Sequence, residues 1–189
     1  MKEVLTIGFV ATAISPYFSE EQQVRIKSEN HLKKIIAEYD AKLICFHKTI
    51  FSKEDSVEAE KFFKNKIDFL ILQTSSCSSG EQLYPLCNIT NKMGLWAVPD
   101  LENEGDVKLH SLVSVSHYLG IIKKILHEKK IKTKWFYNYG DTDEFKNKFL
   151  ITLRSLVADK KIKQSKIGLV GGISVSYTHL RAHETREDR

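Results

Sequence analysis

The chain has 189 residues, a formal net charge of +5 and 42% hydrophobic residues, which suits one α/β domain with a sizeable core and is short for most two-domain enzymes. Its lysines alternate with glutamates and gather at predicted helix ends, where the helix dipole favours cations, so we expect no nucleic-acid surface. The sequence has no apolar run of eighteen residues and no basic, apolar leader, and its three cysteines lack metal-type spacing, so we expect a cytoplasmic protein with reduced thiols and no membrane partner.

Short apolar runs alternate with amphipathic stretches, a pattern typical of parallel strands joined by crossover helices. The first strand is predicted over 4–11, because a continuous apolar run fits a strand that is covered on both faces. Ser19 followed by Gln22 predicts the capping box of a helix. The buried face of that helix has helical spacing: Leu32, Ile35, Ile36 and Tyr39. A strand over 42–46 and a helix over 56–65 follow.

The third strand is predicted over 67–73, and a small polar loop that ends at Gly80 follows it. Open α/β sheets bind ligands at loops of this kind, beyond the carboxyl ends of their strands. The candidate ligand contacts are Gln73, Thr74, Ser76 and Cys77. A connection with a helix cap near Ser79 is an equally favoured interpretation. Cys77 has no recognisable base partner in the sequence, so we do not predict a catalytic thiol.

The second half of the chain repeats the alternation. A helix is predicted over 81–92, interrupted or started late by Pro85, and Gly94 precedes a strand over 95–98. After an acidic loop, the next helix has an inward face made of Tyr118, Ile121, Ile122, Ile125 and Leu126. A fifth strand over 134–139 comes next.

The last predicted helix is capped by Asp141 together with Glu144. Its buried stripe comprises Phe145, Phe149, Leu153, Leu156 and Val157. A sixth strand over 166–170 leads to Gly171 and Gly172. The expected fold is therefore Rossmann-like or flavodoxin-like, an open, mainly parallel sheet of about five or six strands with helices on both faces.

Aromatic residues and histidines add few candidates for chemistry. The aromatic residues in or beside the later strands are expected in the core: Trp96, Trp135, Tyr137 and Tyr139. Trp96 is also a secondary candidate for ligand contact, because it lies near the carboxyl end of its strand. His31 and His127 are expected on helix surfaces. The histidines before residue 175 lack carboxylates at ligand spacing, so we predict neither a metal site nor a catalytic constellation.

The last fifteen residues differ in origin from the rest. Residues 175–185 read VSYTHLRAHET, which matches one reading frame of a transposon-end adapter used in preparing DNA sequencing libraries. We therefore expect a truncated natural domain over 1–174 and an artefactual, disordered tail over 175–189. His179 and His183 in that tail resemble half of a zinc site that lacks a third ligand.

Several segments resemble, in order and spacing, the N-terminal region of the L-fucose isomerase and L-arabinose isomerase superfamily. They are Leu72-Gln73-Thr74 with its Gly80 loop, Leu95 to Pro99, Leu109 to Leu112, Tyr139-Gly140-Asp141, and Ile167 to Gly172. The likeness spans nearly all of residues 1–174. It implies a fragment of a metal-dependent aldose-ketose isomerase of carbohydrate metabolism, in which Mn²⁺ polarises the sugar oxygens and carboxylates move a proton through an enediol.

In that family the metal ligands lie downstream of the matched region, so the fragment is expected to bind no metal and to be inactive. The resemblance implies a homo-oligomer whose N-terminal domain packs subunits together and contacts sugar, partly from the loop after the third strand. Fucose isomerases tend to carry an aromatic residue ahead of the glycine in that loop, and Ser76 to Gly80 has none, so another sugar is at least as compatible. The alternative is a non-enzymatic, small-ligand-binding module of periplasmic-binding-protein-like or flavodoxin-like fold.

Overall fold

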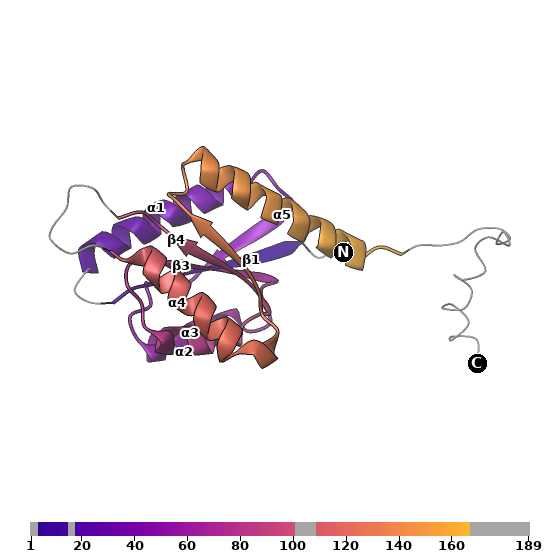
Figure 1. Cartoon of the computed structure of the whole chain (residues 1–189). Coiled ribbons are helices and arrows are strands. Elements are labelled where there is room, and N and C mark those ends of the chain that lie inside the picture. The colour runs from indigo at the N-terminus through magenta and orange to yellow at the C-terminus, as the bar shows by residue number, and fades with distance from the viewer. Residues whose placement is uncertain (1–3, 15–17, 101–108, 167–189) are drawn as a thin grey trace, which may run out of the picture.

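The computed structural model describes residues 4–14, 18–100 and 109–166, with side chains of the first helix from residue 23 onward. Its five strands are β1 (Leu5–Thr12), β2 (Ala41–Cys45), β3 (Phe69–Thr74), β4 (Lys92–Ala97) and β5 (Lys132–Tyr137). They form one parallel sheet in the order β2-β1-β3-β4-β5 (Figure 1). This is the flavodoxin-like strand order, so the predicted fold class is confirmed.

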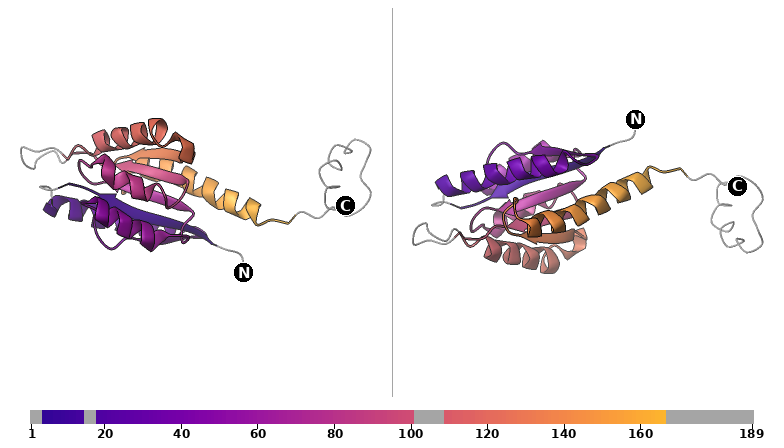
Figure 2. Two further views of the ribbon diagram at one scale, coloured as in Figure 1. Left: turned by 90° about the horizontal axis from the view of Figure 1, so that it is seen from below. Right: turned by 90° about the horizontal axis from the view of Figure 1, so that it is seen from above.

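Helices cover both faces of the sheet. They are α1 (Phe18–Ile36), α2 (Lys53–Phe63), α3 (Gly80–Leu86), α4 (Ser111–Lys124) and α5 (Asp143–Lys163), with a 3₁₀ turn, η1 (His127–Lys129), before β5. α1 and α5 lie over one face, and α2, α3 and α4 lie over the other (Figure 2). Right-handed crossovers place α1 on one face and α2, α3 and α4 on the other, because the chain moves one way from β1 to β2 and the opposite way from β2 through β3 and β4 to β5. α5 follows β5 and packs in the same core as α1.

Successive residues of β3 supply the two cores in alternation. All six residues of the strand are buried. Leu70 and Leu72 pack under α2, α3 and α4, whereas Phe69 and Ile71 pack under α1 and α5. A strand with apolar layers on both sides is continuously apolar, which explains why this strand is plain in the sequence.

The boundaries around β4 differ from the prediction. α3 ends at Leu86 rather than near residue 92, and β4 begins at Lys92 rather than at residue 95. Gly94 therefore lies inside the strand. A Cβ atom at Gly94 would lie 2.8 Å from Cε2 of Phe136 and 2.8 Å from Cζ of Phe69. The glycine is needed because two aromatic rings close over the strand at this point, and it does not mark a turn.

Three helices begin at other residues than the sequence predicted. The chain is already helical at Phe18, so Ser19 does not cap α1. α2 starts at Lys53, three residues early, because Ser52 and Asp55 form a capping box. Thr142, one residue after the predicted Asp141, caps α5 by accepting a hydrogen bond from the Phe145 N–H.

Two predicted core residues are exposed. Ile125 follows the end of α4 and lies in solvent. Trp135 lies on the edge strand β5, where it is half exposed and the Lys148 ammonium lies 3.6 Å from its ring centroid. An edge strand is covered incompletely, so its aromatic residue binds a cation instead of entering the core. The predicted sixth strand from residue 167 onward and the tail over 175–189 lie outside the described residues.

Candidate functional site

The carboxyl ends of β1 and β3 meet where the strand order reverses. β1 pairs with β2 on one side and with β3 on the other, so the connections after β1 and β3 leave the sheet toward opposite faces. Open α/β sheets bind ligands in the crevice at such a reversal. The sequence-predicted loop after β3 is at this edge.

This loop is held by a dense network of hydrogen bonds. The hydroxyls of Thr12 and Ser78 are 3.0 Å apart, and Ser114 Oγ on α4 accepts a hydrogen bond from the Ser78 N–H at 2.8 Å. Ser76 Oγ accepts from the Ile14 N–H at 3.3 Å. Ser76 is fully buried. Its side chain therefore joins the loops after β1 and β3, and the predicted contact residue acts here as a support.

Thr74 lies in a second network one residue earlier. Its hydroxyl donates to the Ser111 carbonyl at 2.9 Å, and Ser111 Oγ donates back to the Thr74 carbonyl. Ser111 Oγ also accepts from the Val98 N–H at 2.9 Å. Thr74 is fully buried, and these bonds tie the ends of β3 and β4 to the first turn of α4.

Gln73 and Trp96 reach from the sheet toward two other segments of the same edge. The Gln73 amide donates to Ser28 Oγ on α1 at 2.6 Å, and its oxygen accepts from Ser75 Oγ. The Trp96 indole donates to the Asn138 carbonyl, in the connection from β5 to α5, at 2.8 Å. Both side chains are fully buried. They position α1 and the β5–α5 connection relative to the sheet.

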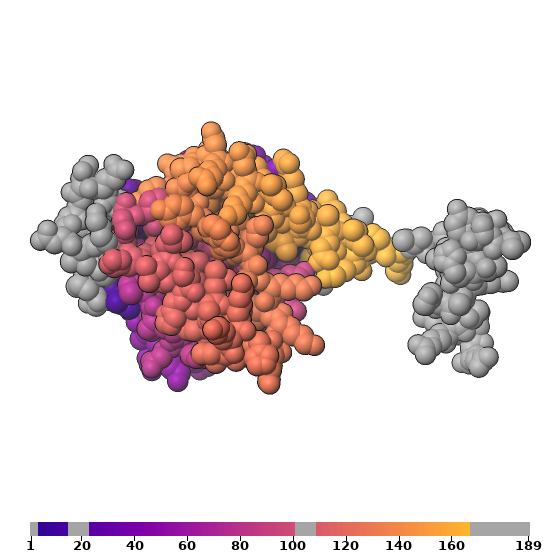
Figure 3. Space-filling view, viewed as in Figure 1, coloured from indigo at the N-terminus to yellow at the C-terminus, as the bar shows by residue number. Residues whose placement is uncertain are grey.

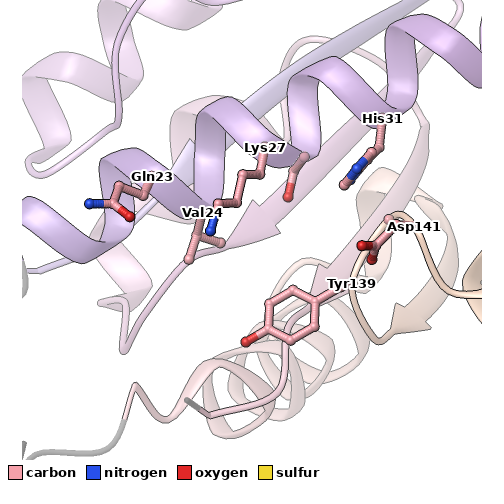
Figure 4. A pocket seen from close by; sticks show the side chains of 8 residues that line it. Gln23, Val24, Lys27, His31, Tyr139 and Asp141 are labelled. Carbon is pink, nitrogen blue, oxygen red and sulfur yellow. The ribbon is translucent and has the colours of Figure 1, made fainter. Parts of the chain in front are cut away.

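A pocket of about 290 Å³ lies between these two segments (Figure 4). It is lined by Gln23, Val24, Lys27, Ser28, His31, Tyr139, Gly140 and Asp141. Lys27 and His31 come from α1, and Tyr139 and Asp141 come from the opposite wall. The volume is near the lower end of the range for small-molecule sites.

The pocket lining offers both donors and acceptors. The Lys27 ammonium donates only, whereas the Asp141 carboxylate accepts only. Burial, followed by the negative charge of Asp100, raises the pKa of Tyr139, so its phenol is neutral and donates to the Pro99 carbonyl at 3.1 Å. A side chain at position 140 would force the two walls of the pocket to shift, because a Cβ there would lie 2.8 Å from the Cβ of His31. The arrangement suits a small ligand with several hydroxyl or carbonyl oxygens.

A larger hollow of about 430 Å³ lies at the opposite, amino edge of the sheet. Its charged groups are already paired with one another: Lys92 and Lys163 both contact Asp159, at 2.7 and 2.9 Å. Parallel sheets bind ligands at the carboxyl edge. We therefore assign the candidate site to the smaller pocket.

Two of the three cysteines have raised pKa values. All three are free thiols. Burial raises the pKa of Cys87 to about 12, and burial followed by the charge of Glu29 raises the pKa of Cys45 to about 12. These two thiols are therefore protonated and unreactive near neutral pH. Cys77, the predicted contact, is partly exposed in the loop after β3.

The sequence-predicted contacts and the candidate pocket lie at the same edge of the sheet, but the predicted residues do not form the pocket walls. Gln73 and Trp96 lie behind the pocket, whereas Thr74, Ser76 and Cys77 belong to the neighbouring loop. The sequence-based prediction did not include the residues that line the pocket. They are Lys27, Ser28 and His31 on α1, and Tyr139 and Asp141 after β5. His31, expected on the surface, is half-buried in a wall. The polar Tyr139-Gly140-Asp141 segment directly after a predicted strand was the available signal for the second wall.

In the described part of the chain, no three His, Cys, Asp or Glu side chains form a group that could hold a metal ion. None of the described helices combines the length and the apolar character that crossing a membrane requires. No model of a known protein family matches the chain, and no curated protein matches it.

Proposed function

We propose that this chain is the sugar-contacting α/β domain of an aldose-ketose isomerase of the kind that its sequence resembles. The observation that carries the proposal is the carboxyl-edge pocket, which has donors on one wall and an acceptor on the other. Each sugar hydroxyl both donates and accepts, so a monosaccharide can satisfy Lys27 and Asp141 together. The side chains of Val24 and Tyr139 offer apolar surface for the C–H groups of the ring.

The chain's own residues account for binding and orientation of the sugar. Isomerisation through an enediol also needs a base and, in the family that the sequence resembles, Mn²⁺ as a Lewis acid. The described residues do not fit a Mn²⁺ site, because no group of three ligating side chains is present among them. Under this proposal the described residues bind and orient the sugar, and the metal and the base would come from other residues of the enzyme.

Two further properties belong to this proposal. The resemblance implies a homo-oligomer. We also propose a cytoplasmic location, which the three free thiols support.

The direct experiment measures binding of a panel of aldoses and ketoses by saturation-transfer NMR. We expect dissociation constants on the order of 1 mM, because a small ligand meets few polar groups in this pocket. Lys27→Ala and Asp141→Ala each remove one charged hydrogen-bonding group and should weaken binding about 10-fold.

Matched controls lie close to the substituted residues in the sequence. Lys34→Ala changes another exposed lysine of α1, and Asp143→Ala changes an exposed aspartate two residues after Asp141. Neither residue lines the pocket, so both variants should bind sugar as the unaltered chain does. Absence of binding to every sugar, or equal losses in the Lys27→Ala and Lys34→Ala variants, would contradict the proposal.

A second candidate function is that of a non-enzymatic binding module. The opposite charges of Lys27 and Asp141 on facing walls also suit a zwitterion, whose carboxylate and ammonium groups would pair with them. Amino acids therefore belong in the same panel. Binding of an amino acid at least 10-fold tighter than any sugar would favour the module over the isomerase domain.

A further inference from the structure

Ser28 on α1 is the most deeply buried of the polar side chains that line the candidate pocket, with 3% of its surface exposed. Its Oγ accepts a hydrogen bond from the Gln73 amide at 2.6 Å. An amide N–H can only donate, so the hydroxyl proton of Ser28 must be directed elsewhere.

Other serines in helices of this protein use their proton within the helix. Serines inside helices commonly donate to the carbonyl four residues earlier. Ser56 donates in this way to the Ser52 carbonyl at 3.3 Å, and Ser155 donates to the Ile151 carbonyl at 2.8 Å. Ser28 makes no such bond, and among the described residues none accepts its proton. A buried donor without an acceptor is costly, and the pocket is where a ligand can supply one.

Gln73 sets the direction of this hydroxyl. Its amide oxygen accepts from Ser75 Oγ at 3.3 Å, so its amide nitrogen is the end that is turned to Ser28. Gln73 is fully buried in β3, where packing holds it in place. Linked hydrogen bonds polarise one another, which strengthens Ser28 as a donor. The donor is therefore oriented before any ligand arrives, and this lowers the cost of binding.

The neighbouring groups on the α1 wall also donate. The Lys27 ammonium donates only, and the His31 imidazole carries at least one N–H in every protonation state. Both residues line the pocket together with Ser28. The Asp141 carboxylate, which accepts only, lies on the opposite wall (Figure 4). The α1 wall therefore favours an oxygen that carries no proton, whereas Asp141 favours a hydroxyl.

We propose that the ligand is an acidic sugar, which carries a carboxylate or a phosphate at one end. Its anionic oxygens accept hydrogen bonds from Lys27, Ser28 and His31, and its hydroxyls donate to Asp141. An anionic oxygen is a stronger acceptor than a neutral hydroxyl, so the acid gains more from the α1 wall than a neutral sugar does. The inference rests on the proposed function, because it names the substrate class of the same pocket.

The charged groups of the pocket are open to solvent. Lys27 and Asp141 are both exposed, and the orange segment that follows β5 forms part of the outer surface in Figure 3. Salt screens exposed charges, so the contribution of Lys27 to acid binding should decline as ionic strength rises. The contribution of Ser28 should persist, because its hydroxyl is buried and uncharged.

Matched pairs of sugars test the proposal on the full chain by saturation-transfer NMR at low ionic strength. Galacturonate and galactose 6-phosphate are compared with galactose, and glucuronate with glucose, so the carboxylate and the phosphate are tested separately. At least one acid should bind about 10-fold more tightly than its parent sugar, because hydrogen bonds to charged groups are the stronger ones. Equal affinities for acids and parents would overturn this inference and leave the proposed function standing. Absence of binding to every sugar would overturn both.

Two variants test how the acid is recognised. Ser28→Ala removes the oriented donor and should lower the preference for the acid over its parent about 5-fold. Gln73→Met removes the N–H that orients Ser28 and should lower the same ratio several-fold. Ser56→Ala is the matched control, because Ser56 is also a buried helix serine but lies on α2, outside the pocket lining, and its replacement should leave the ratio unchanged.

The ratio of the two affinities separates recognition from a structural role. A variant that only disturbs the wall should weaken the acid and its parent equally, whereas loss of the oriented donor should weaken mainly the acid. Circular dichroism confirms the fold of each variant. An unchanged ratio in both Ser28→Ala and Gln73→Met would overturn the assignment of the acid group to the α1 wall.

Discussion

Gly94 lies inside a strand because neighbouring side chains leave no room for a larger residue at this position. In the sequence it precedes the strand that was predicted over 95–98. In the structure it lies within β4, because the rings of Phe69 and Phe136 occupy the space above it. Both rings come from neighbouring strands, so no pattern local to residue 94 reveals them.

A pair of glycine substitutions tests this account. Gly94→Ala should lower the free energy of unfolding by about 1–3 kcal/mol, because the new methyl group would overpack the two rings. Gly120→Ala should raise it by up to about 1 kcal/mol, because alanine is the better helix former and the space there is open. Urea denaturation of both variants at low micromolar concentration measures the difference. Equal effects of the two changes would argue against the enclosed environment of Gly94.

The role of Gln73 also depends on a contact with a residue that is distant in the sequence. Its position at the carboxyl end of β3 was predicted from the strand and loop pattern, but its bond to Ser28 joins residues 45 positions apart. A polar residue at a ligand-binding edge can face the ligand or support the wall. Sequence spacing alone does not separate these two roles.

At the scale of elements, the start of α5 depends on one hydroxyl. Thr142 Oγ1 accepts from the Phe145 N–H, although Asp141 is also a favoured capping residue type. Asp141 is exposed at the pocket instead. Two adjacent capping residues are indistinguishable by pattern, and tertiary packing of the β5–α5 connection selects between them.

Alanine substitutions at these neighbouring positions should therefore have different effects. Thr142→Ala should cost about 1 kcal/mol of stability, because an N–H in the first turn of α5 loses its partner. Asp141→Ala should change stability by less than about 0.5 kcal/mol. Thermal unfolding followed by circular dichroism measures both. A larger loss in Asp141→Ala than in Thr142→Ala would contradict the observed cap.

An ion-pair cluster connects β4 and α5 at the other edge of the sheet. Hydrogen bonds from Lys92 and Lys163 lower the pKa of Asp159 from 3.8 to about 2. Because the folded pKa lies below the unfolded value, the pairing stabilises the protein above the unfolded pKa and is lost as pH falls through the folded one.

Asp159→Asn should accordingly be less stable than the unaltered chain at neutral pH, and the difference should shrink between about pH 4 and pH 2. Urea midpoints measured across this range check the expectation. Asp143→Asn is the control, since the Asp143 side chain is 96% exposed, and its difference should stay small at every pH. A deficit of Asp159→Asn that is independent of pH would exclude the ion pairs as its source.

At the scale of the whole molecule, the alternation of apolar and amphipathic segments was sufficient to predict a parallel sheet with helices on both faces. The order of the strands then places the ends of β1 and β3 at a reversal point. The pocket walls could not be predicted in the same way. Lys27 on α1 and Asp141 after β5 are more than 100 residues apart, and only the packing of α1 beside the β5–α5 connection brings them to one cavity.

The most direct test of the central claim, that a small polar ligand of the sugar class binds at the carboxyl edge, is a two-dimensional ¹H–¹⁵N NMR titration of the full chain with the best-binding aldose. The predicted result is a saturable set of shifts at the amides of Ser28, His31, Gly140 and Asp141, with the amino-edge residues Asn91 and Lys163 unchanged. Shifts confined to the amino edge, or none at millimolar sugar, would contradict the account.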